Sequence, residues 1–373
     1  MRVALDVSAV PQRLAGAGRY VAELARRLPP SGVATTVVAR RGDAERWRTM
    51  SPNALVTPIV PSGRVARLAF EAWALGTSRP ARDVDVWHGP HYTMPRRGAT
   101  PTVVTVHDLT FFTHPEWHER SKVVFFQRAI TYAARHARVL VCVSDFTARE
   151  LDAIVPDHPP VVVAPHGVDL ARFSPESLDD EGLLARNGLA TDVAFIFFVG
   201  TVEPRKGLDV LLSAFARLAG DHPNVELWLA GQPGWGMDEF DGLVAASGAA
   251  ARVRRLGFVE DVVLPALLRR ARAVVYPSRG EGFGLPVLEA MACGAPVVTT
   301  AQTVMAEVAD SCATLTRAGD VTGLADALDE VLRLSAEARA ELGRASRARA
   351  SRFTWEASLE SHHEAYQLAL RGL

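Results

Sequence analysis

The stretch PSRGEGFGLPVLEAMACG, which runs from Pro277 to Gly294, sets two carboxylates on either side of a glycine-rich turn that leads into a helix. Pro286 suits the first helical position, where its missing N–H costs nothing. The turn before it is therefore expected to present backbone N–H groups at a helix N-terminus, and such an end binds phosphate. Glu281 is expected in the loop at the rim, and Glu289 about one turn into the helix. The alternative is an ordinary loop and helix start of an α/β unit.

A second stretch, FVGTVEPRKGLDVLLSAF from Phe198 to Phe215, supplies positive charge, because Arg205 and Lys206 follow a predicted strand and precede a predicted helix. The chain has only two lysines, Lys122 and Lys206, among its 41 basic residues. A lysine in a chain that otherwise uses arginine indicates a need for a compact point charge. We expect this basic pair to bind phosphate groups. The alternative is a solvated helix cap, although a cation there opposes the helix dipole unless an anion compensates it.

With these two stretches the chain resembles a GT-B glycosyltransferase of the large retaining family described as glycosyl transferases group 1. Further segments that carry the resemblance are GAGRYVAEL near the start, TVVTVHDL around His107, VCVSDFTARE from Val141, and PHGVD at the end of the first half. The resemblance spans nearly the whole chain, and the spaced pair Glu281 and Glu289 is its most specific part. It implies an α/β fold of two doubly wound Rossmann-like domains that face each other across a cleft.

By resemblance, Glu281 contacts the hydroxyls of the donor sugar and Glu289 the ribose, while Arg205 and Lys206 bind the diphosphate of a nucleotide sugar. Such cations neutralise the leaving diphosphate without waiting for solvent to reorganise. Retention of anomeric configuration can use a covalent carboxylate nucleophile, as glycosidases do. The resemblance instead favours attack from the same face, with the departing phosphate oxygen accepting the proton of the acceptor. No nucleophilic residue is therefore predicted.

The remaining donor contacts are also expected from the C-terminal half. Backbone amides of the turn would add to the diphosphate site, at Phe283, Gly284 and Leu285. The resemblance places the nucleotide base beside RLGFVED, near Val259. Many members carry an arginine directly after the glycine that ends the first strand of this half. Here that glycine is Gly200 and a threonine follows it, so the basic pair is expected to hold the diphosphate unaided.

The N-terminal half supplies candidates of its own. Gly16 and Gly18 lie between the opening strand and a helix expected to start near Arg19, and they resemble the phosphate-side loop of the family. A tight turn that needs positive φ would demand the same residues. His107 ends the strand TVVTV and is expected to project from the carboxyl edge of the first sheet. By resemblance it contacts the donor sugar and helps define where the acceptor hydroxyl enters.

Two alternatives for His107 stay open. One is a structural histidine at a strand end that bonds to a backbone carbonyl. The other is a metal-binding His-Asp pair with the adjacent aspartate, although the neighbouring histidines show no pattern of metal ligands. No aspartate cluster of the metal-binding type is visible elsewhere. We therefore expect no metal cofactor.

Short apolar runs alternate with helical patterns in both halves, which is typical of parallel sheets with crossover helices. The length of 373 residues exceeds what one core usually supports. We predict an acceptor-side domain over residues 1–175, a nucleotide-sugar domain over 190–352, and a helix over 353–373 that returns to the first domain. A polar connector, SLDDEGLLARNGLATD, separates the domains. The alternative for the last helix is that it caps the second domain only.

Charge is divided unevenly along the chain. Residues 1–170 carry 21 basic and 15 acidic side chains, and the remainder carries 20 and 27. A basic half favours an anionic acceptor or an anionic membrane surface; dispersed arginines on a solvated face are the alternative. The stretch GRVARLAFEAWALGTSR, from Gly63 to Arg79, fits an interfacial helix, although apolar positions at helical spacing are first a sign of core packing.

The same composition bears on cellular location and partners. The chain has no run of about 18 apolar residues, and it opens with a predicted buried strand rather than a signal peptide. We expect a cytoplasmic enzyme, with peripheral contact at the inner membrane face left open. No nucleic-acid-binding module is visible. Three cysteines are expected to be reduced, two of them in the core: Cys142, Cys293 and Cys312.

The predicted function is that of a retaining hexosyltransferase of polysaccharide biosynthesis. It would move a hexose, mannose in the first place, to a hydroxyl of a glycan or lipid-linked sugar. The donor would be GDP-mannose or a UDP-sugar. One alternative is a non-catalytic GT-B subunit that binds a nucleotide or a partner enzyme, and another is an epimerase of the same fold.

Overall fold

The computed structural model describes residues 1–14, 16–177, 179–189, 192–232, 234 and 237–371. The chain divides into two compact units. Unit 1 comprises Met1–Gly167 together with the C-terminal helix from Trp355, and unit 2 comprises Val168–Thr354. Each unit is described by itself below.

The division differs in detail from the predicted boundaries. The chain passes into unit 2 at Val168, ahead of the connector. The connector itself contains a helix, α8 (Asp180–Arg186), where only a polar linker was expected. This helix is anchored, because the Asp180 carboxylate accepts two hydrogen bonds from the Arg269 guanidinium, at 2.7 and 2.5 Å.

Unit 1 is built on a seven-stranded parallel sheet in the order β3-β2-β1-β4-β5-β6-β7. Its strands are β1 (Arg2–Asp6), β2 (Ala34–Arg40), β3 (Leu55–Val60), β4 (Val86–Gly89), β5 (Thr102–Val106), β6 (Val139–Cys142) and β7 (Val161–Val163). Its helices are α1 (Gly16–Arg27), α2 (Ala44–Met50), α3 (Arg64–Trp73), α4 (Arg79–Arg82), α5 (Thr110–Thr113), α6 (Arg120–His136), α7 (Asp145–Ile154) and α16 (Trp355–Arg371). The order reverses between β1 and β4.

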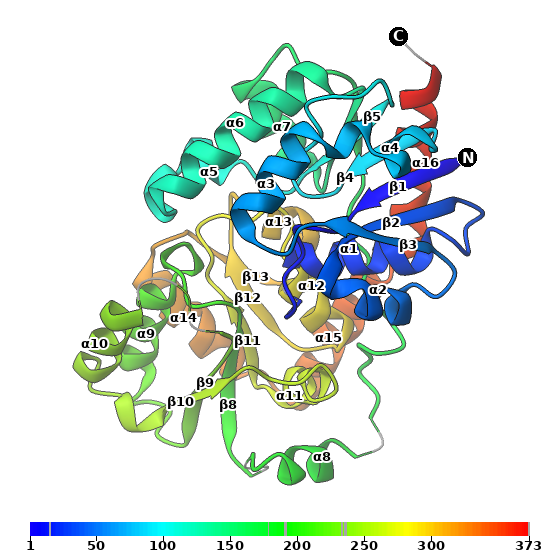
Figure 1. The fold of residues 1–373 in the computed structure, drawn as a ribbon. Helices are drawn as coiled ribbons and strands as arrows, with labels where there is room; N and C mark the ends of the chain where they lie inside the picture. Colours follow the sequence, from blue (N-terminus) through cyan, green and yellow to red (C-terminus); the bar gives the residue numbers. More distant parts are fainter. Residues whose placement is uncertain (15, 178, 190–191, 233, 235–236, 372–373) are drawn as a thin grey trace. The chain divides into compact units, whose positions relative to one another are not determined.

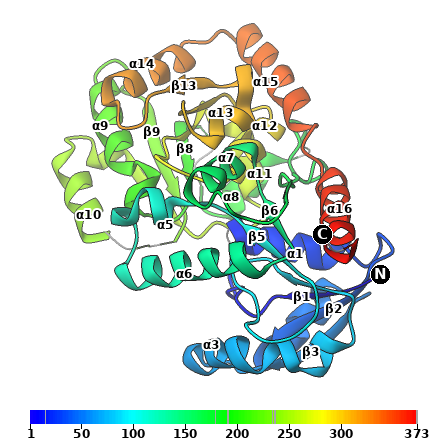
Figure 2. The ribbon, with the colours of Figure 1, turned by 90° about the horizontal axis from the view of Figure 1, so that it is seen from above.

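The sequence did not predict strand β3. It contains Pro58, which cannot donate to a sheet ladder, and its alternation of apolar and polar residues is weak. The position of the strand explains why proline is tolerated. Strand β3 lies at the edge of the sheet, where helix α3 runs beside it (Figure 2).

The C-terminal helix α16 packs on strands β5, β6 and β7 of unit 1 (Figures 1 and 2). Polar contacts join it to the core. His362 Nε2 lies 2.7 Å from the Tyr20 hydroxyl, and the Tyr366 hydroxyl lies 2.8 Å from His88 Nδ1. The Thr105 hydroxyl lies 2.8 Å from both the Tyr20 hydroxyl and His88 Nε2, so that one network ties four elements together.

This network is held in its neutral form. Burial lowers the pKa of His362 to about 4. Burial, and then the neighbouring His362 and His107, lower the pKa of His88 well below its ordinary value. A buried imidazole without a carboxylate partner favours its uncharged state. The polar network that joins α16 to the core of unit 1 therefore carries no charge.

Unit 2 is built on a six-stranded parallel sheet in the order β10-β9-β8-β11-β12-β13. Its strands are β8 (Ala194–Val199), β9 (Val225–Ala230), β10 (Val253–Gly257), β11 (Ala273–Tyr276), β12 (Val297–Thr300) and β13 (Thr314–Thr316). Besides α8, its helices are α9 (Leu208–Leu218), α10 (Met237–Ala246), α11 (Leu264–Arg270), α12 (Leu285–Ala292), α13 (Val304–Ala309), α14 (Val321–Leu332) and α15 (Ala336–Ala350). The fold class predicted from the sequence, two doubly wound α/β domains, is confirmed.

The three cysteines are free. Cys142 and Cys293 are buried, as predicted, and Cys312 is half-buried. Burial raises the pKa of the Cys142 and Cys293 thiols to about 12. Among the residues described, every helix is too short or too polar to cross a membrane.

Candidate functional site

The predicted site residues of unit 2 lie at one point of its sheet. The strand order reverses between β8 and β11, which are hydrogen-bonded neighbours. The loop after β8 carries Arg205 and Lys206, and the loop after β11 carries Glu281. Parallel strands bring their carboxyl ends to the same edge, and open α/β sheets bind ligands where the strand order reverses. The topology therefore brings the two loops together.

Backbone contacts join the two loops. The Arg205 carbonyl oxygen accepts a hydrogen bond from the Arg279 N–H at 2.7 Å and lies 3.0 Å from the Ser278 hydroxyl oxygen. Gly207 follows with φ +68°, and a Cβ at this position would lie 2.2 Å from the Pro277 carbonyl oxygen. Glycine is needed both for the positive φ and for the close approach.

At this junction the structure brings Arg205, Lys206 and Glu281 into direct contact. Glu281 Oε1 accepts a hydrogen bond from Lys206 Nζ, and Glu281 Oε2 lies 2.8 Å from Arg205 Nη1. Lys206 Nζ also donates to the Tyr276 hydroxyl at 2.5 Å. The Ser278 hydroxyl donates to Glu281 Oε1 at 2.8 Å, so both carboxylate oxygens are engaged. We call these five residues the ion cluster.

The ion cluster is largely closed to water. The exposed fractions of the Lys206, Glu281 and Arg205 side chains are 8%, 12% and 20%. Burial alone would raise the pKa of Glu281, but the charges of Arg205 and Lys206 outweigh it and lower that pKa to about 2. For Lys206, burial and the neighbouring Arg205 lower the pKa, and Glu281 opposes them. The carboxylate is thus firmly ionised.

A second carboxylate balances the charge. Glu203 Oε2 lies 3.0 Å from Arg205 Nε. Two cations therefore face two carboxylates, and an incoming anion has to compete with Glu203 and Glu281 for the same N–H groups. Glu281 lies in the loop between β11 and α12, where the sequence predicts it. Its oxygens lie inside the cluster, because the loops after β8 and β11 are joined so tightly.

The predicted glycine turn is present. Gly284 has φ +95° and caps helix α12, which begins at Leu285. Pro286 therefore occupies the second helical position instead of the first. Phe283 and Leu285 have buried side chains. Glu289 is buried too, one turn further along the same helix.

Two predicted contacts of the nucleotide lie further out. The Gly200 N–H, directly after β8, donates to the Ala230 carbonyl oxygen at 2.9 Å. A Cβ on Gly231 would lie 1.9 Å from the Gly200 carbonyl oxygen, so β8 and β9 end in close backbone contact. Val259 follows β10, two strands away from β8. A contact of Val259 with the nucleotide base stays a prediction.

His107 is buried directly after β5. Its Nε2 lies 2.8 Å from the Pro90 carbonyl oxygen, and the Tyr20 ring meets it edge-on at 5.1 Å. Burial, and then the charge of His91, lower the pKa of His107 to about 4. This is the carbonyl-bonded arrangement that the sequence left open as the structural alternative. Contact with a donor sugar stays a prediction.

Two further predictions for unit 1 concern the metal-binding alternative at His107 and Asp108 and the glycine segment at Gly16 and Gly18. Asp108 bonds to the Tyr92 and Thr110 hydroxyls. No group of three or more His, Cys, Asp or Glu side chains within the described ranges is placed to hold a metal ion. Gly16 and Gly18 lie inside the first turn of α1, which begins earlier than predicted, and neither has positive φ. The predicted helix start near Arg19 is therefore wrong, and so is the alternative of a tight turn with positive φ; the role of these glycines as a phosphate-side loop stays a prediction.

Comparisons with known proteins agree with this geometry. The family profile described as Glycosyl transferases group 1 matches residues 179–349, and that described as Glycosyltransferase Family 4 matches residues 14–172. The chain is 31% identical to the O-antigen chain mannosyltransferase B of Escherichia coli, over 83% of this chain and 80% of that protein. The chain belongs to the glycosyltransferases.

Other relatives and solved structures are similar over most of the chain. A D-inositol 3-phosphate glycosyltransferase of Geodermatophilus obscurus is 30% identical, over 97% of this chain and 90% of that protein. The sucrose-phosphate synthase of Thermosynechococcus elongatus superimposes with a TM-score of 0.78 at 22% identity, covering 98% of both chains. The Anabaena protein HepE, in complex with UDP-glucose, gives 0.75 at 20% identity, covering 98% of this chain and 99% of that one. The structural neighbours are GT-B glycosyltransferases, and they support the fold.

Sequence reasoning missed four residues around the site of this glycosyltransferase: Glu203, Tyr276, Ser278 and Arg279. Three of them stand within three residues of a predicted one, and Tyr276 stands five residues before Glu281. Tyr276 is the last residue of a predicted strand, so the carboxyl edge was a signal for it. Arg279 gave none, since its guanidinium bonds to the Pro204 carbonyl oxygen and to Asp209 and fastens the loops.

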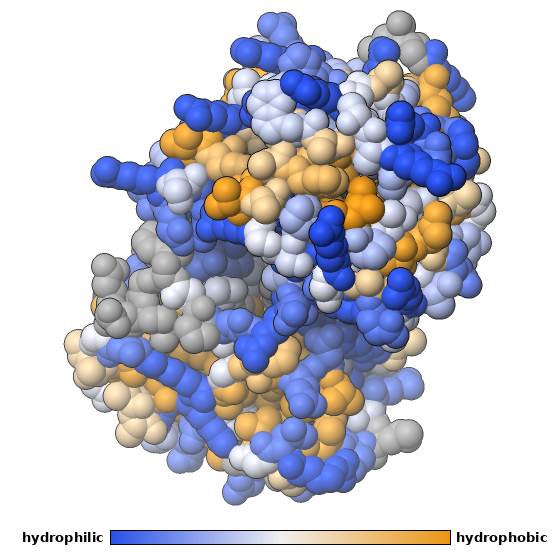
Figure 3. All heavy atoms as spheres, viewed as in Figure 1, coloured by the Kyte–Doolittle hydropathy of each residue, from blue (hydrophilic) through white to orange (hydrophobic). Residues whose placement is uncertain are grey.

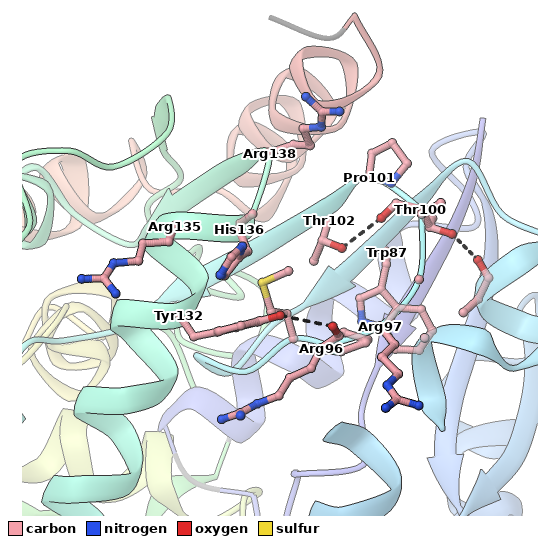
Figure 4. Close-up of a pocket in the computed structure, with 17 residues that line it drawn as sticks. Trp87, Arg96, Arg97, Thr100, Pro101, Thr102, Tyr132, Arg135, His136 and Arg138 are labelled. Atoms are coloured by element: carbon pink, nitrogen blue, oxygen red, sulfur yellow. Dashed lines mark hydrogen bonds between the residues drawn. The ribbon is translucent and has the colours of Figure 1, made fainter. Parts of the chain in front are cut away.

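A pocket of about 470 Å³ lies at the amino-terminal edge of the unit 1 sheet, where β4, β5 and β6 begin. Figure 4 shows Tyr132 and His136 on one side of it and Trp87 with Thr102 on the other. No acidic side chain of the described residues lines the pocket. Four arginines do: Arg96, Arg97, Arg135 and Arg138.

The substitution Glu281→Gln tests the ion cluster. Lys206 and Arg205 would keep their charges in a nearly closed site, so we expect the free energy of unfolding near pH 7 to fall by about 3 kcal/mol. The folded-state pKa of Glu281 is about 2 against an ordinary value of 4.5. The loss is therefore fully present above the ordinary pKa and shrinks as the pH falls through this range. Urea unfolding at several pH values measures it.

Glu176→Gln is the matched control, because Glu176 is an exposed carboxylate of the same unit. We expect it to change the free energy of unfolding by less than about 0.5 kcal/mol at every pH. A loss in Glu281→Gln that stays constant from about pH 7 to about pH 3 would show that the charge of Glu281 is not what stabilises the cluster.

Proposed function

We propose that this glycosyltransferase moves a hexose, with mannose as the first choice, from a nucleotide-diphosphate sugar to an acceptor hydroxyl with retention of configuration. The observation that carries the proposal is the ion cluster at the point where the strand order of unit 2 reverses. A diphosphate needs cations there, and a sugar needs a carboxylate beside them. Arg205, Lys206 and Glu281 are these groups.

The choice of donor rests on the relatives. The Escherichia coli protein of 31% identity is named a mannosyltransferase, which supports GDP-mannose. HepE, in complex with UDP-glucose, supports a UDP-sugar as the second choice. The name of the Escherichia coli relative also supports a glycan or lipid-linked sugar as the acceptor and a role in polysaccharide biosynthesis.

We propose that the donor binds by exchange of ion pairs. The diphosphate oxygens would take over the N–H groups of Lys206 and Arg205 that Glu281 now occupies. The released Glu281 oxygens would then accept hydrogen bonds from the sugar hydroxyls. During this exchange Lys206 and Arg205 stay paired with anionic oxygens, and the Glu281 carboxylate stays hydrogen-bonded to the Ser278 hydroxyl and the sugar, which avoids the large cost of a buried charge without partners. It also makes Glu281 available only when a diphosphate is present.

In the reaction, the bond from the anomeric carbon to the diphosphate oxygen breaks as the bond to the acceptor oxygen forms on the same face of the sugar. The proton of the acceptor hydroxyl passes to the departing phosphate oxygen. Lys206 and Arg205 stabilise the negative charge that grows on the diphosphate, and they are fixed in place beforehand. Glu289, on α12, would hold the ribose. No metal is proposed, because the two cations supply the charge.

Donor turnover tests the assignment. Lys206→Ala removes a contact to the leaving group and Glu281→Ala a contact to the sugar, so we expect each to slow transfer by about 100-fold or more. Nucleotide release is measured with a panel of GDP- and UDP-sugars, with and without glycan and lipid-linked acceptors. Circular dichroism verifies that the variants are folded.

The chain offers close controls. Lys122→Ala removes the only other lysine, which lies exposed on α6 in a pair with Glu119, and Glu176→Ala removes an exposed glutamate. Both should turn over donor at the wild-type rate. Wild-type turnover in Lys206→Ala and Glu281→Ala would refute the site. Nucleotide binding without turnover of any donor would favour the non-catalytic subunit instead.

We further propose that the enzyme works in the cytoplasm with unit 1 in contact with an anionic membrane surface. On α3, Phe70 packs towards the core, but Val65 and Trp73 are 81% and 58% exposed. Core packing, the interpretation that the sequence favours, therefore explains Phe70 but not Val65 and Trp73. Figure 3 shows apolar side chains gathered on this face of unit 1. The Arg97 guanidinium stacks over the Trp73 ring at 4.7 Å and joins the helix to the basic pocket of Figure 4.

Sedimentation with lipid vesicles tests this contact. We expect wild type to bind vesicles rich in phosphatidylglycerol and not phosphatidylcholine vesicles, because apolar burial and anionic attraction act together. Val65→Gln/Trp73→Gln should weaken binding by about 10-fold or more. Val262→Gln, at a valine that is 61% exposed on unit 2, is the control and should bind as wild type does. Equal binding of all three proteins would refute the assignment of α3.

A further inference from the structure

A pocket of about 730 Å³ lies in unit 2, away from the ion cluster. Its lining residues come from α11 and the segment before β11, from the turn between α12 and β12, and from α14 to α15. These segments meet at the amino-terminal edge of the sheet, whereas the ion cluster follows the carboxyl ends of β8 and β11. The pocket is therefore a separate site.

The pocket is positively charged. Among the residues described, no acidic side chain lines it, while five arginines do: Arg269, Arg272, Arg339, Arg344 and Arg347. Two of these serve the framework, since Arg269 pairs with Asp180 and Arg347 donates to backbone carbonyl oxygens. The other three have no carboxylate in ion-pair contact within the described part of the chain: Arg272, Arg339 and Arg344.

Arg339 shows the electrostatic cost of this arrangement. Its guanidinium is fixed, because Nη1 donates to the Arg272 carbonyl oxygen at 2.7 Å and Nη2 to the Ala271 carbonyl oxygen at 2.5 Å. Burial, and then the like charge of Arg272, lower the pKa of Arg339 to about 10. Two neighbouring cations without a carboxylate repel each other, and a bound anion would remove that cost.

The rest of the lining indicates the kind of anion. Leu334, Ala340 and Pro175 add apolar surface beside the arginines. The volume falls in the range of pockets for small molecules. Planar guanidinium groups match the oxygens of phosphate in paired hydrogen bonds.

We propose that this pocket binds a phosphate-bearing small molecule. Its phosphate would contact Arg272, Arg339 and Arg344, and its apolar part would lie on Leu334 and Ala340. A soluble metabolite and a lipid headgroup both present this chemistry, so the phosphate group is what the pocket recognises.

The pocket touches the helix that carries part of the donor site. Helix α12 has eight residues and spans about 12 Å, from the glycine turn at its start to Cys293 and Gly294, which line the pocket. Helix α15 packs directly on its end, because a Cβ on Gly343 would lie 2.8 Å from the Gly294 carbonyl oxygen. An occupant of the pocket thus lies against the end of the helix on which Glu289 sits. Binding at the pocket does not depend on the proposed transferase function.

Calorimetric titration of inorganic pyrophosphate into the full chain tests the proposal. We expect two binding sites, one in the pocket and one at Lys206. Arg272→Gln/Arg344→Gln should weaken the first by at least ~10-fold through loss of charge-assisted hydrogen bonds. Lys206→Ala should remove the second only. Arg317→Gln, at an exposed arginine of unit 2 that does not line the pocket, should keep both.

A second variant guards against misfolding. Ala340→Glu introduces a carboxylate beside Arg344 on an exposed turn of α15, and it should block pyrophosphate in the same way. The proposal is overturned if both pocket variants keep two sites of unchanged affinity, or if wild type shows only the site that depends on Lys206. A single site that persists in Lys206→Ala would count against the proposed donor site and leave the pocket supported.

Phosphatidylglycerol vesicles distinguish the sources of the phosphate. If Arg272→Gln/Arg344→Gln sediments less than Arg317→Gln, the ligand is a lipid headgroup. If the two sediment equally while the double variant has lost a pyrophosphate site, the ligand is a soluble phosphate compound.

Discussion

The contact between Lys206 and Glu281 is the interaction on which the proposed function of this chain depends. It joins two loops that are 75 residues apart along the chain. The topology of unit 2 makes the contact possible. Strands β8 and β11 are far apart along the chain but adjacent in the sheet, at the point where the strand order reverses. The backbone holds the two loops together, because Gly207 lets one loop approach the Pro277 carbonyl oxygen of the other. A fixed cation beside a fixed carboxylate is suited to a ligand that carries a diphosphate next to hydroxyl groups.

The polar network on α16 and the ion cluster of unit 2 differ in charge. In unit 1, His88, His362 and their tyrosine partners are neutral. They attach helix α16 to the sheet of this unit. In unit 2, Arg205, Lys206 and Glu281 are charged and nearly closed to water. Neutral networks need no counter-ion and suit a structural role, whereas buried charges need compensation and respond to an anion. We therefore assign the neutral network to the fold and the charged cluster to the proposed ligand site.

The fold class was predictable because short, valine-rich strands such as β5, β6, β7 and β11 alternate with helical segments, as parallel sheets with crossover helices require. Strand β3 was not predictable, because Pro58 interrupts its pattern. A proline is tolerated there only because β3 lies at the edge of the sheet. Arg205, Lys206 and Glu281 were predictable from their loops, but their mutual ion pairs were not. These ion pairs depend on contacts between the two loops, such as the hydrogen bond from Arg279 to the Pro204 carbonyl oxygen. The sequence of a single loop does not show such contacts. His107 was placed at the right strand end, but its bond to the Pro90 carbonyl oxygen depends on a loop far from it in sequence.

The most direct test is a crystal structure with an intact or non-hydrolysable nucleotide sugar. We predict diphosphate oxygens about 3 Å from Lys206 Nζ and from the Arg205 guanidinium, with a Glu281 oxygen accepting a hydrogen bond from a sugar hydroxyl where Lys206 bonded before. A nucleotide sugar bound with its diphosphate away from Lys206, and with the Lys206 to Glu281 contact unchanged, would contradict this.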